Sequence, residues 1–526
     1  MTNKQEKKIR IQCDQQNPFS GRNIPALLLD NLGECYIVGG AVRDACLVRK
    51  FADLDITLAP CSDLKKRIRR LAKELDSSPF EMDVENQVWR ISGPKDCPFQ
   101  FDIMPFQGGD FESDMRRRDF TVNALAVRVN AKTRLSYNPN DNLFSLKTGK
   151  KELIDLCGGL RDLSDLKIRA VSDNVFRDDP LRLLRAYRIA AEHGMKISRR
   201  TLSQIRRDSS LIANSAGERI REELLKLLDR DDSCKWIRQI HASGMLFVIF
   251  PELATQPSCA TDYYGEGGVL RHTFAVLDRT DVFFARMHDF CPDYEKIERH
   301  LSVHRNGLYK FIALMHDIAK PAKATFIDGR LRFFGHEECG ALMTRQIMER
   351  LHFSKDETRL ACTVIGAHLR PGNLAINEVV SERAMFRLFR AMGNATIPLL
   401  VLCWADYASY ITPARLERFR PDLSKEPPEE DITVLPYNSP KKTLRFLQTI
   451  YAIARCYLKK EASLNQKTYA DGNDVIRILG IEPGPEVGRT LEQLRLLQFN
   501  GRINDRQQAL DWLEGHRKKT FKKGEK

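Results

Sequence analysis

The hydrophobic and polar positions in the first part of the chain alternate in short runs that predict strands. Cys35–Val38 is an apolar run that ends in a pair of glycines and predicts a strand followed by a turn. Leu54–Leu58 and Phe99–Met104 alternate polar and apolar residues, as half-buried strands do. Between them, Ser62–Leu75 has the spacing of a basic amphipathic helix with Ser62 as its N-cap. The pattern therefore predicts a small α/β unit.

Helical spacing dominates from about residue 130 onward, and a Pro-rich, acidic stretch at 425–440 interrupts it as a linker. The predicted fold class is α+β, with a small α/β head followed by all-α segments. The pattern divides the chain into five segments: a flexible N-terminal segment (1–20), the head (21–130), neck and body helices (131–250), a second helical block (251–420) and a helical C-terminal tail (421–526).

The composition is that of a folded chain with several buried cores. Of 526 residues, 42% are hydrophobic and 8% aromatic, which excludes a largely disordered protein and a collagen-like fibre. No run approaches the roughly 18 apolar residues that span a bilayer, and the N-terminus lacks the apolar segment of a secretory signal. We therefore expect a cytoplasmic protein that has no membrane partner.

The net charge and the cysteines indicate which binding partner and which redox compartment to expect. The 84 Lys and Arg residues against 70 Asp and Glu give a charge of +14, which favours a polyanionic partner such as nucleic acid over solubility alone. Thirteen cysteines are scattered without a CxxC pair. This pattern indicates reduced thiols in a cytosol and argues against a zinc ribbon or a dithiol redox site.

The first group of residues with chemical potential lies in the head. Gly39 and Gly40 follow the first predicted strand and open a predicted helix, where backbone N–H groups can approach an anion. Asp53 and Asp55 then lie two residues apart in a strand, so their side chains point to the same side. Neighbouring carboxylates repel each other unless a divalent cation lies between them, and this arrangement is typical of a two-metal Mg²⁺ site.

Further polar residues of the head fit the same chemistry. Asp102 lies in an apolar strand and is the candidate for a third catalytic carboxylate, with an exposed residue on a half-buried strand as the alternative. Arginines 116–118 can neutralise a triphosphate, although an arginine run is usually solvated surface. Asp119 and Asn123 can orient an arginine or hydrogen-bond to ribose hydroxyls.

Together these residues resemble the class II tRNA nucleotidyltransferase and bacterial poly(A) polymerase superfamily. The similarity runs through five motifs in the family's order: GGAVRD (39–44), DLD (53–55), RRDFTVNALA (117–126), RDDPLRLLRAYRIA (177–190) and ERIREELLKLL (218–228). It covers about residues 30–230 and implies a polymerase-β-like head followed by neck and body helices.

The resemblance implies specific roles. Asp53 and Asp55 would bind Mg²⁺. The residues expected to bind the nucleotide are Gly39, Gly40 and Arg43 at the triphosphate and Arg118 and Asp119 on the ribose side.

In the family an aspartate and an arginine select the incoming base, and they correspond here to Asp179 and Arg182. At positions i and i+3 we expect these two residues to share a helix face. The preceding acid is commonly Glu in the family and is Asp178 here, so the choice of base stays open. Arg185 and Arg188 extend a basic stripe from Arg182 that could meet RNA phosphates or face solvent.

A second group lies in the helical block. Eight of the eleven histidines fall in residues 272–368, which indicates metal binding, although histidines also occur on surfaces. His316 and Asp317 lie in the apolar sequence FIALMHDIAKP, where they need each other or a metal. His288 and Asp289 repeat the dipeptide in less apolar surroundings, and we exclude them from the metal set.

The ordered set resembles the HD phosphohydrolase superfamily in the version fused to nucleotidyltransferases. The resemblance implies an HD domain at 251–420 and a binuclear divalent-metal site of unknown metal. Its ligands would be His272, His316, Asp317, His336, His368 and Asp406. Such metals would activate water for attack on a phosphomonoester or a 2′,3′-cyclic phosphate at an RNA end. The alternative is a vestigial domain that keeps the ligands and serves as an RNA scaffold.

The resemblance favours an enzyme that adds C and A to the 3′ end of tRNA, with CTP and ATP as substrates. The RNA 3′-hydroxyl would attack the α-phosphate, and the helical tail would contact RNA. An enzyme that adds only CC or only A, and a poly(A) polymerase, are the close alternatives. The poly(A) polymerase is less favoured because the region after the DxD strand lacks a GRRF-like basic run. A non-catalytic RNA scaffold and an HD hydrolase with a degenerate head conflict with the acidic and base-selecting residues. The oligomeric state stays open.

Overall fold

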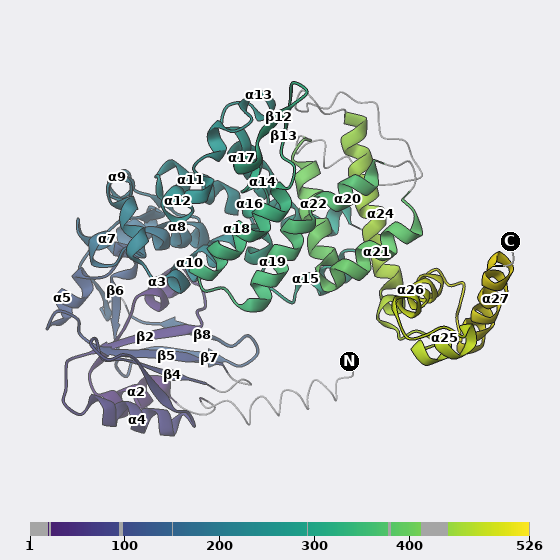
Figure 1. The fold of residues 1–526 in the computed structure, drawn as a ribbon. Helices are drawn as coiled ribbons and strands as arrows, with labels where there is room; N and C mark the ends of the chain where they lie inside the picture. Colours follow the sequence, from purple (N-terminus) through teal and green to yellow (C-terminus); the bar gives the residue numbers. More distant parts are fainter. Residues whose placement is uncertain are drawn as a thin grey trace. The chain divides into compact units, whose positions relative to one another are not determined.

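The computed structural model describes Phe19 and residues 23–93, 98–149, 151–291, 293–376, 380–411 and 440–524. It divides into two compact units, residues 1–215 with 240–249 and residues 216–239 with 250–526 (Figure 1). The first unit carries the main sheet, and the second is helical apart from one hairpin. The predicted α+β class is therefore confirmed. The predicted linker at 425–440 and the segment 1–20 lie outside the described residues, except for Pro440 and Phe19.

The first unit is built on a seven-stranded sheet of order β3-β4-β5-β2-β1-β6-β9. Neighbouring strands are antiparallel except β2 and β5, which pair in parallel. The strands are β1 (Cys35–Val38), β2 (Asp53–Leu58), β3 (Pro79–Asp83), β4 (Val88–Ser92), β5 (Gln100–Pro105), β6 (Leu125–Arg128) and β9 (Leu153–Asp155). Helices α2 (Ile24–Leu32) and α4 (Leu64–Glu74) cover one face and α3 (Gly40–Cys46) the other (Figure 1). The strand predicted from an apolar run, β1, and the two predicted from alternation, β2 and β5, are confirmed.

Helix α4 is the predicted basic amphipathic helix with a different start. Its N-cap is Asp63 rather than Ser62. The residues it buries are Leu64, Ile68, Leu71 and Ala72. This spacing of four, three and one residues forms one apolar stripe, so the cations point away from the core.

Residues 131–155 carry strands where the sequence pattern predicts helices. β7 (Arg134–Asn138) and β8 (Leu143–Lys147) form an antiparallel hairpin, and β9 joins the edge of the main sheet beside β6. The buried residues of β7 and β8 alternate with exposed or half-buried ones. The period-two signal was thus present in the sequence, but the runs are short.

Phe19 also departs from the expectation of a flexible N-terminal segment. Its side chain is buried, at 5% exposure. Its ring centroid lies 5.0 Å from Phe99, 5.9 Å from Phe101, 5.2 Å from Tyr137 and 5.7 Å from Phe144. Aromatic pairs at these separations stabilise a core beyond the area that they bury. Phe19 therefore belongs to the aromatic core of the head.

Short helices complete the first unit. They are α5 (Phe111–Arg116), α6 (Gly159–Ser164), α7 (Val175–Asp178), α8 (Arg182–His193), α9 (Arg199–Asp208) and α12 (Met245–Ile249). A two-stranded sheet, β10 (Lys167–Ile168) and β11 (Lys196–Ile197), lies among them. α8 buries an apolar face, and its three arginines are half-buried.

The second unit is a helical assembly. Its helices are α10 (Gly217–Leu228), most of α11 (Ser233–Ala242), α13 (Thr261–Tyr264), α14 (Gly268–Phe290), α15 (Tyr294–Leu301), α16 (Asn306–Met315), α17 (Lys320–Lys323), α18 (His336–Arg350), α19 (Lys355–Ala367), α20 (Leu369–Ala375), α21 (Glu382–Met392), α22 (Thr396–Ala408), α24 (Pro440–Asn465), α25 (Gly472–Leu479), α26 (Pro485–Phe499) and α27 (Arg506–Gly524). The last three share a separate apolar core around Val475, Leu494 and Leu513.

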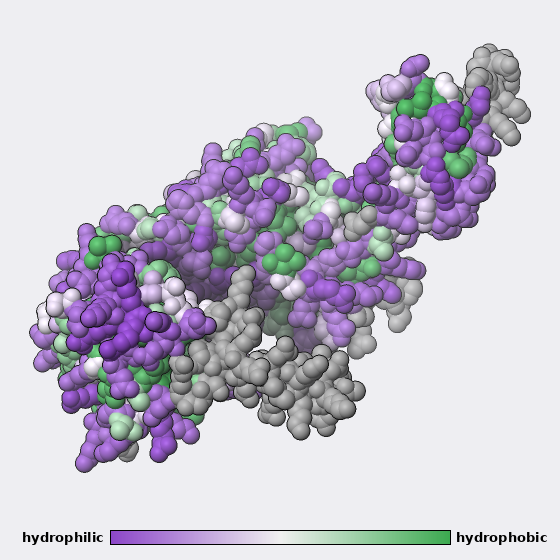
Figure 2. Space-filling view, turned by 90° about the horizontal axis from the view of Figure 1, so that it is seen from below, coloured by the Kyte–Doolittle hydropathy of each residue, from purple (hydrophilic) through white to green (hydrophobic). Residues whose placement is uncertain are grey.

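The segment Glu382–Ala408 is long and apolar enough to cross a membrane, but 78% of its apolar window is buried inside the structure. Burial of this kind is typical of a core helix. Most of the surface in Figure 2 is hydrophilic, with apolar residues in separate spots rather than a continuous band over the coloured atoms. The segment therefore gives weak support for a membrane span.

A buried ion pair joins three helices of the second unit. Lys310 on α16 is 0% exposed, and its Nζ lies 2.6 Å from an Asp281 carboxylate oxygen on α14. Asp281 also accepts hydrogen bonds from the Ser233 hydroxyl and the Cys234 amide at the start of α11. Lys310 donates to the Arg230 carbonyl at 2.6 Å. Both charges are therefore fully compensated, which is the condition for burying them.

We predict that Lys310→Met lowers the free energy of unfolding of the second unit by about 3 kcal/mol, because Asp281 stays buried without its cation. Urea denaturation followed by circular dichroism measures the change. The double variant Lys310→Met with Asp281→Asn removes both charges and should recover part of the loss. Equal or greater destabilisation in the double variant would contradict this account of the pair.

Candidate active sites

The two predicted metal carboxylates of the head lie side by side on β2. Asp53 is exposed and Asp55 half-buried. Asp55 is in register with Val38 on β1 and with Asp102 on the parallel strand β5. Burial raises the pKa of Asp55 to about 6, Arg118 opposes the rise, and Asp102 adds to it. The structure thus gathers three acids at neighbouring strand positions, and a cation would relieve their repulsion.

Asp102 has a partner that the sequence did not reveal. Arg90 on β4 donates to both of its carboxylate oxygens, at 2.7 and 2.6 Å. The two residues are in register on adjacent antiparallel strands. A bidentate pair of this kind is a strong interaction and fixes both side chains. Asp102 is therefore held by Arg90 in this structure, and its role as a third metal carboxylate stays a prediction.

The glycine turn lies directly against the acids. Gly39 precedes α3 with φ 74° and ψ −134°, a conformation that L side chains rarely adopt. A Cβ on Gly39 would lie 3.0 Å from Asp55 Oδ2 and 3.2 Å from a guanidinium nitrogen of Arg118. Arg118 also lies 3.2 Å from Asp114, which the sequence analysis had not singled out. The turn therefore needs glycine, because a side chain at residue 39 would be strained and would crowd both a carboxylate and an arginine.

Four of the predicted nucleotide residues form one hydrogen-bonded chain. Arg43 donates to the Asn123 amide oxygen at 2.7 Å, and Asn123 donates to Asp119 at 2.9 Å. Asp119 also accepts two hydrogen bonds from Arg185 on α8, at 3.0 and 2.8 Å. Burial alone would raise the pKa of Asp119, but Arg185 and Asn123 lower it to about 2. The predicted basic stripe thus reaches the head through Arg185.

The predicted base-selecting pair lies at a helix break rather than on one helix. Asp179 follows α7 with extended backbone, and Arg182 is the first residue of α8. Pro180 between them is incompatible with a continuous helix, because it restricts the residue before it. The expectation of a shared helix face is therefore wrong, although both residues lie at the start of α8. Arg188, further along α8, is engaged with Glu192 at 2.7 Å.

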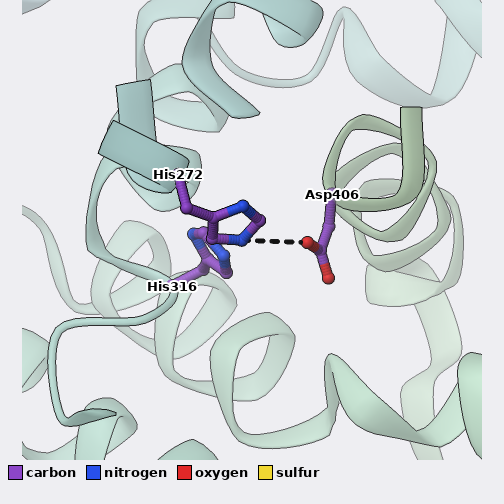
Figure 3. A group of neighbouring side chains, drawn as sticks. All are labelled: His272, His316 and Asp406. Atoms are coloured by element: carbon purple, nitrogen blue, oxygen red, sulfur yellow. Dashed lines mark ion pairs between the residues drawn. The ribbon is translucent and has the colours of Figure 1, made fainter. Parts of the chain in front are cut away.

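The six predicted ligands of the second unit converge in one place. Figure 3 shows His272, His316 and Asp406 pointing toward one another from three separate elements. The six divide into two groups, and within each group the potential ligand atoms lie within 4.8 Å of one another. One group is His272, His316 and Asp406, and the other is Asp317, His336 and His368.

Asp317 connects the two groups. One of its oxygens lies 3.4 Å from His272 Nε2 and 3.1 Å from His316 Nε2. The other lies 3.4 Å from His336 Nε2 and 3.8 Å from His368 Nε2. A carboxylate with one oxygen toward each group would be able to offer one oxygen to a divalent metal in each.

The orientation of the histidines fits divalent metals. The Nδ1 atoms of His316, His336 and His368 lie 2.7–2.8 Å from the backbone carbonyl three residues before each. A carbonyl accepts only from N–H, so each Nε2 presents its lone pair to the centre. Burial, the largest cause, together with the neighbouring His316 and His336, lowers the pKa of His368 to about 4, so its ring is neutral near pH 7.

Several buried atoms of the site lack a hydrogen bond. The Nε2 atoms of His272 and His316 and both oxygens of Asp317 are buried without a partner of hydrogen-bond geometry. The Nε2 atoms of His336 and His368 lie 3.2 Å apart. With both Nδ1 atoms protonated, this approach brings two lone pairs together. Imidazole and carboxylate donors arranged in this way fit a pair of divalent metals.

Two further residues of this site were missed by the sequence analysis. The Nζ atom of Lys320, three residues after Asp317, lies 2.6 Å from an Asp317 oxygen and 2.8 Å from the Tyr264 hydroxyl. The Tyr264 ring stacks on His272 with a centroid distance of 4.8 Å. Burial opposes ionisation of Asp317, but the cation of Lys320 helps to hold the pKa of this carboxyl well below its usual range. The sequence signal that could have identified Lys320 is its position three residues after Asp317, which is a helical spacing.

Family models match in the order of the structural elements. A poly(A) polymerase head domain matches residues 35–169, a probable RNA and SrmB-binding site of polymerase A matches 194–256, and an HD domain matches 290–411. The chain belongs to the class II tRNA nucleotidyltransferase and poly(A) polymerase superfamily with an HD domain. The head model covers the DxD strand, and the HD model covers all the predicted HD ligands except His272.

Curated members of this superfamily match over most of the chain. A CC-adding tRNA nucleotidyltransferase from Geobacter sulfurreducens is 28% identical over 483 residues, which cover 91% of each chain. An A-adding tRNA nucleotidyltransferase from Deinococcus radiodurans is 27% identical and covers 90% of this chain and 93% of its own. A Nitrosococcus oceani multifunctional CCA protein is 28% identical over 65% of this chain and 78% of its own.

Solved structures share the fold. A CCA-adding enzyme in its second apo form has a TM-score of 0.58, 18% identity and 94% coverage of both chains. The Thermotoga maritima CCA-adding enzyme complexed with tRNA has a TM-score of 0.53, 18% identity and coverage of 97% and 95%. At this identity the likeness shows that the fold is shared and nothing more.

We predict that Gly39→Ala lowers the rate of nucleotidyl transfer at least tenfold. The backbone strain of a side chain at this φ is about 1–3 kcal/mol, and the new Cβ displaces Asp55 or Arg118. Gly40→Ala is the comparison, because its Cβ would meet only an Arg43 nitrogen at 3.6 Å and its φ is not positive. Steady-state rates of the two variants measure the difference, and an equal loss in both would contradict a specific role of the Gly39 conformation.

The two His-Asp dipeptides provide a matched test of the metal site. We predict that Asp317→Asn removes most of the tightly bound Mn²⁺ in an Asp55→Ala background, because the bridging charge is lost. Asp289→Asn should keep it, since the His288–Asp289 pair is 60% and 42% exposed. Elemental analysis after gel filtration measures the retained metal, and circular dichroism checks the fold. Retention by Asp317→Asn would exclude the bridging role.

Proposed function

We propose that this chain is a template-independent nucleotidyltransferase that adds C and A to the 3′ end of tRNA. The observation that carries the proposal is the acidic pair on β2, with Gly39, Arg118 and Asp55 in close approach. The likeness to CC- and A-adding tRNA nucleotidyltransferases over about nine-tenths of the chain supports tRNA as the acceptor. The net charge of +14 fits an RNA partner.

In the proposed reaction the RNA 3′-hydroxyl oxygen forms a bond to the α-phosphorus of CTP or ATP. The bond from that phosphorus to the oxygen shared with the β-phosphate breaks, pyrophosphate leaves with its electron pair, and the hydroxyl proton is released to solvent. Mg²⁺ bound by Asp53 and Asp55 would supply charge neutralisation and alignment. Because no covalent intermediate is needed, the protein acts by positioning and by neutralising charge.

The other residues of the head bind and orient the nucleotide in this proposal. Gly40 offers its backbone amide to the triphosphate, and Gly39, whose amide donates to the Leu125 carbonyl at 3.2 Å, leaves room for it. Arg43 and Arg118 offer guanidinium groups. Asp119, fixed by Arg185, holds the ribose side with Asn123, which both Arg43 and Asp119 orient.

Asp179 and Arg182 would read the base edge from the start of α8. Asp179 accepts the Leu181 amide at 3.2 Å, and Arg182 reaches the Val175 carbonyl at 3.4 Å, so both sides of the helix break are fixed locally. Such anchoring supports a rigid recognition element. Arg188 would contact RNA phosphates further along α8.

A specific observation favours a narrower second candidate. The relatives that match over at least nine-tenths of both chains add CC or only A, whereas the multifunctional CCA protein of Nitrosococcus oceani matches over 65% of this chain. An enzyme restricted to CC or to the terminal A is therefore the main alternative. A poly(A) polymerase is a further alternative from the same superfamily.

We also propose that the HD domain hydrolyses a phosphate ester at an RNA end. Its six ligands would hold two divalent metals, which supply activation of water and charge neutralisation when bound. Attack of water on a 2′,3′-cyclic phosphate forms one P–O bond and breaks another, and the water proton passes to the released ribose oxygen. Lys320 would stabilise charge beside Asp317.

We place the proposed enzyme in the cytoplasm, where tRNA is processed and thiols stay reduced. The eleven cysteines among the described residues are all free. The five segments retain their proposed roles, with the strands up to Asp155 assigned to the head and residues 421–526 as a helical RNA-binding tail.

The test uses tRNA that lacks its 3′ end, with CTP and ATP supplied separately and together. Addition of three nucleotides that requires both substrates is the expected result for CCA addition. Incorporation that stops after two C residues, or only A onto a CC end, selects the narrower enzyme. A long A tail selects the poly(A) polymerase, and no incorporation overturns the proposal.

Two variants separate the sites. Asp55→Ala should reduce nucleotide incorporation at least a thousandfold and keep hydrolysis of a cyclic phosphate, because the acids lie in different units. Asp317→Asn should do the reverse. Radiolabelled nucleotide incorporation and chromatographic detection of the opened phosphate measure the two activities. Loss of both activities in either variant would contradict two independent sites.

A further inference from the structure

A short hairpin extends the chain between two HD ligands. β12 (Thr325–Ile327) and β13 (Arg330–Arg332) pair through a two-residue turn, in which Asp328 and Gly329 have φ 49° and 69°. Positive φ at both positions is typical of a type I′ turn, which matches the twist of two strands. The hairpin lies next to α17 (Figure 1). It is therefore a defined ribbon, although it pairs with no other strand among the described residues.

The ribbon exposes large apolar side chains. Phe326 is 73% exposed, Ile327 42%, and Phe334, two residues after β13, 73%. Phe326 is in register with Leu331, and Ile327 with Arg330, so apolar side chains lie on both faces. Aromatic rings that stay exposed to water do not contribute to the free energy of folding. Exposed apolar groups that cluster and are rimmed by polar residues mark interaction sites.

The rim of these aromatic residues is cationic. Lys323, Arg330 and Arg332 are exposed, and Asp328 is the one acid between residues 323 and 334. None of the three cations forms an ion pair with another residue in the part of the chain that the structure describes. Exposed aromatic rings with unpaired cations complement a ligand that carries both flat rings and negative charge.

The hairpin is continuous with the HD site at both ends. The chain leaves the site at Asp317 and Lys320, and it returns at Phe333 and His336. The Phe333 carbonyl accepts a hydrogen bond from His336 Nδ1 at 2.7 Å, and its ring centroid lies 5.6 Å from Lys320 Nζ. Each strand spans about 10 Å at roughly 3.3 Å per residue. The hairpin is thus joined to the HD site by two short segments, residues 318–324 before it and residues 333–335 after it.

We propose that the hairpin binds the single-stranded end of an RNA whose terminal phosphate enters the HD site. Bases would stack on Phe326 and Phe334, while Arg330 and Arg332 would bind backbone phosphates. A single strand fits because its bases are free to stack, whereas a duplex hides them within the helix. The inference rests on the proposed phosphohydrolase activity and assigns its substrate class.

The first test measures hydrolysis of a short oligouridylate that ends in a 2′,3′-cyclic phosphate. In Phe326→Ala with Phe334→Ala we expect KM to rise about tenfold and kcat to stay within about twofold, since stacking contributes to binding and not to the chemical step. Phe326→Tyr with Phe334→Tyr keeps a flat ring and should restore KM. Val303→Ala, which shortens another apolar side chain exposed to 74%, is the matched control and should leave KM unchanged.

The arginines give an independent signature. Arg330→Ala with Arg332→Ala should reduce the slope of log KM against log salt by about 0.7 for each RNA phosphate that these side chains neutralise. Retained metal and circular dichroism establish that each variant is folded. An unchanged KM in the alanine pair at Phe326 and Phe334, or failure of the tyrosine pair to restore it, overturns the proposal.

A second measurement keeps the inference separate from the proposed activity. An oligouridylate with 4-thiouridine beside a 3′-phosphate is irradiated with the full chain carrying Asp55→Ala, which keeps all the HD ligands, and crosslinked peptides are identified by mass spectrometry. Crosslinks within residues 323–334 support the hairpin even if no hydrolysis is found, in which case only the phosphohydrolase fails. Hydrolysis by the unsubstituted chain without such crosslinks overturns the hairpin and retains the activity. Crosslinks confined to the head also overturn it.

Discussion

Both candidate sites depend on the compensation of carboxylates that folding removes from water. Asp119 is 7% exposed and Asp317 0% exposed. An ionised carboxylate in such surroundings costs several kcal/mol unless cations and hydrogen bonds surround it. Arg185 compensates Asp119 from a segment 66 residues away. Lys320 compensates Asp317 from the same stretch of chain. The packing of the first unit and the local sequence of the second thus fix the chemistry of their sites.

The sequence predicted the chemical groups better than their partners. The acids at 53 and 55 were found because a strand places residues i and i+2 on one side, a relation that needs no tertiary information. Arg90 was missed because its pairing with Asp102 depends on the register of β4 and β5, which a single sequence does not specify. Asp179 and Arg182 were predicted to share one helix face because they are three residues apart. This prediction gave too little weight to Pro180, which interrupts the helix between them.

The contrast between strong and weak local sequence signals also explains which parts of the fold and of the HD site were predicted. The strands after residue 130 were missed because runs of three to five residues give a weak periodic signal. The HD ligands converge as expected because they lie at helix ends or on helices of one unit, where apolar neighbours already marked His316 as buried. His288 has the same neighbour in sequence but a side chain that is 60% exposed. The local hydrophobic context, more than the dipeptide itself, separated the two.

The two sites also differ in their access to solvent, and this difference bears on how each would acquire metal. On β2, Asp53 is exposed and Asp55 half-buried, so these carboxylates would be open to a cation bound to a nucleoside triphosphate. The side chains of His316 and Asp317 are 0% exposed, and that of Asp406 is 19% exposed. A site closed in this way exchanges ions slowly and couples metal binding to folding. An open acidic pair suits a cation that enters with each substrate, whereas the closed set suits resident metals that water and a phosphate reach from outside.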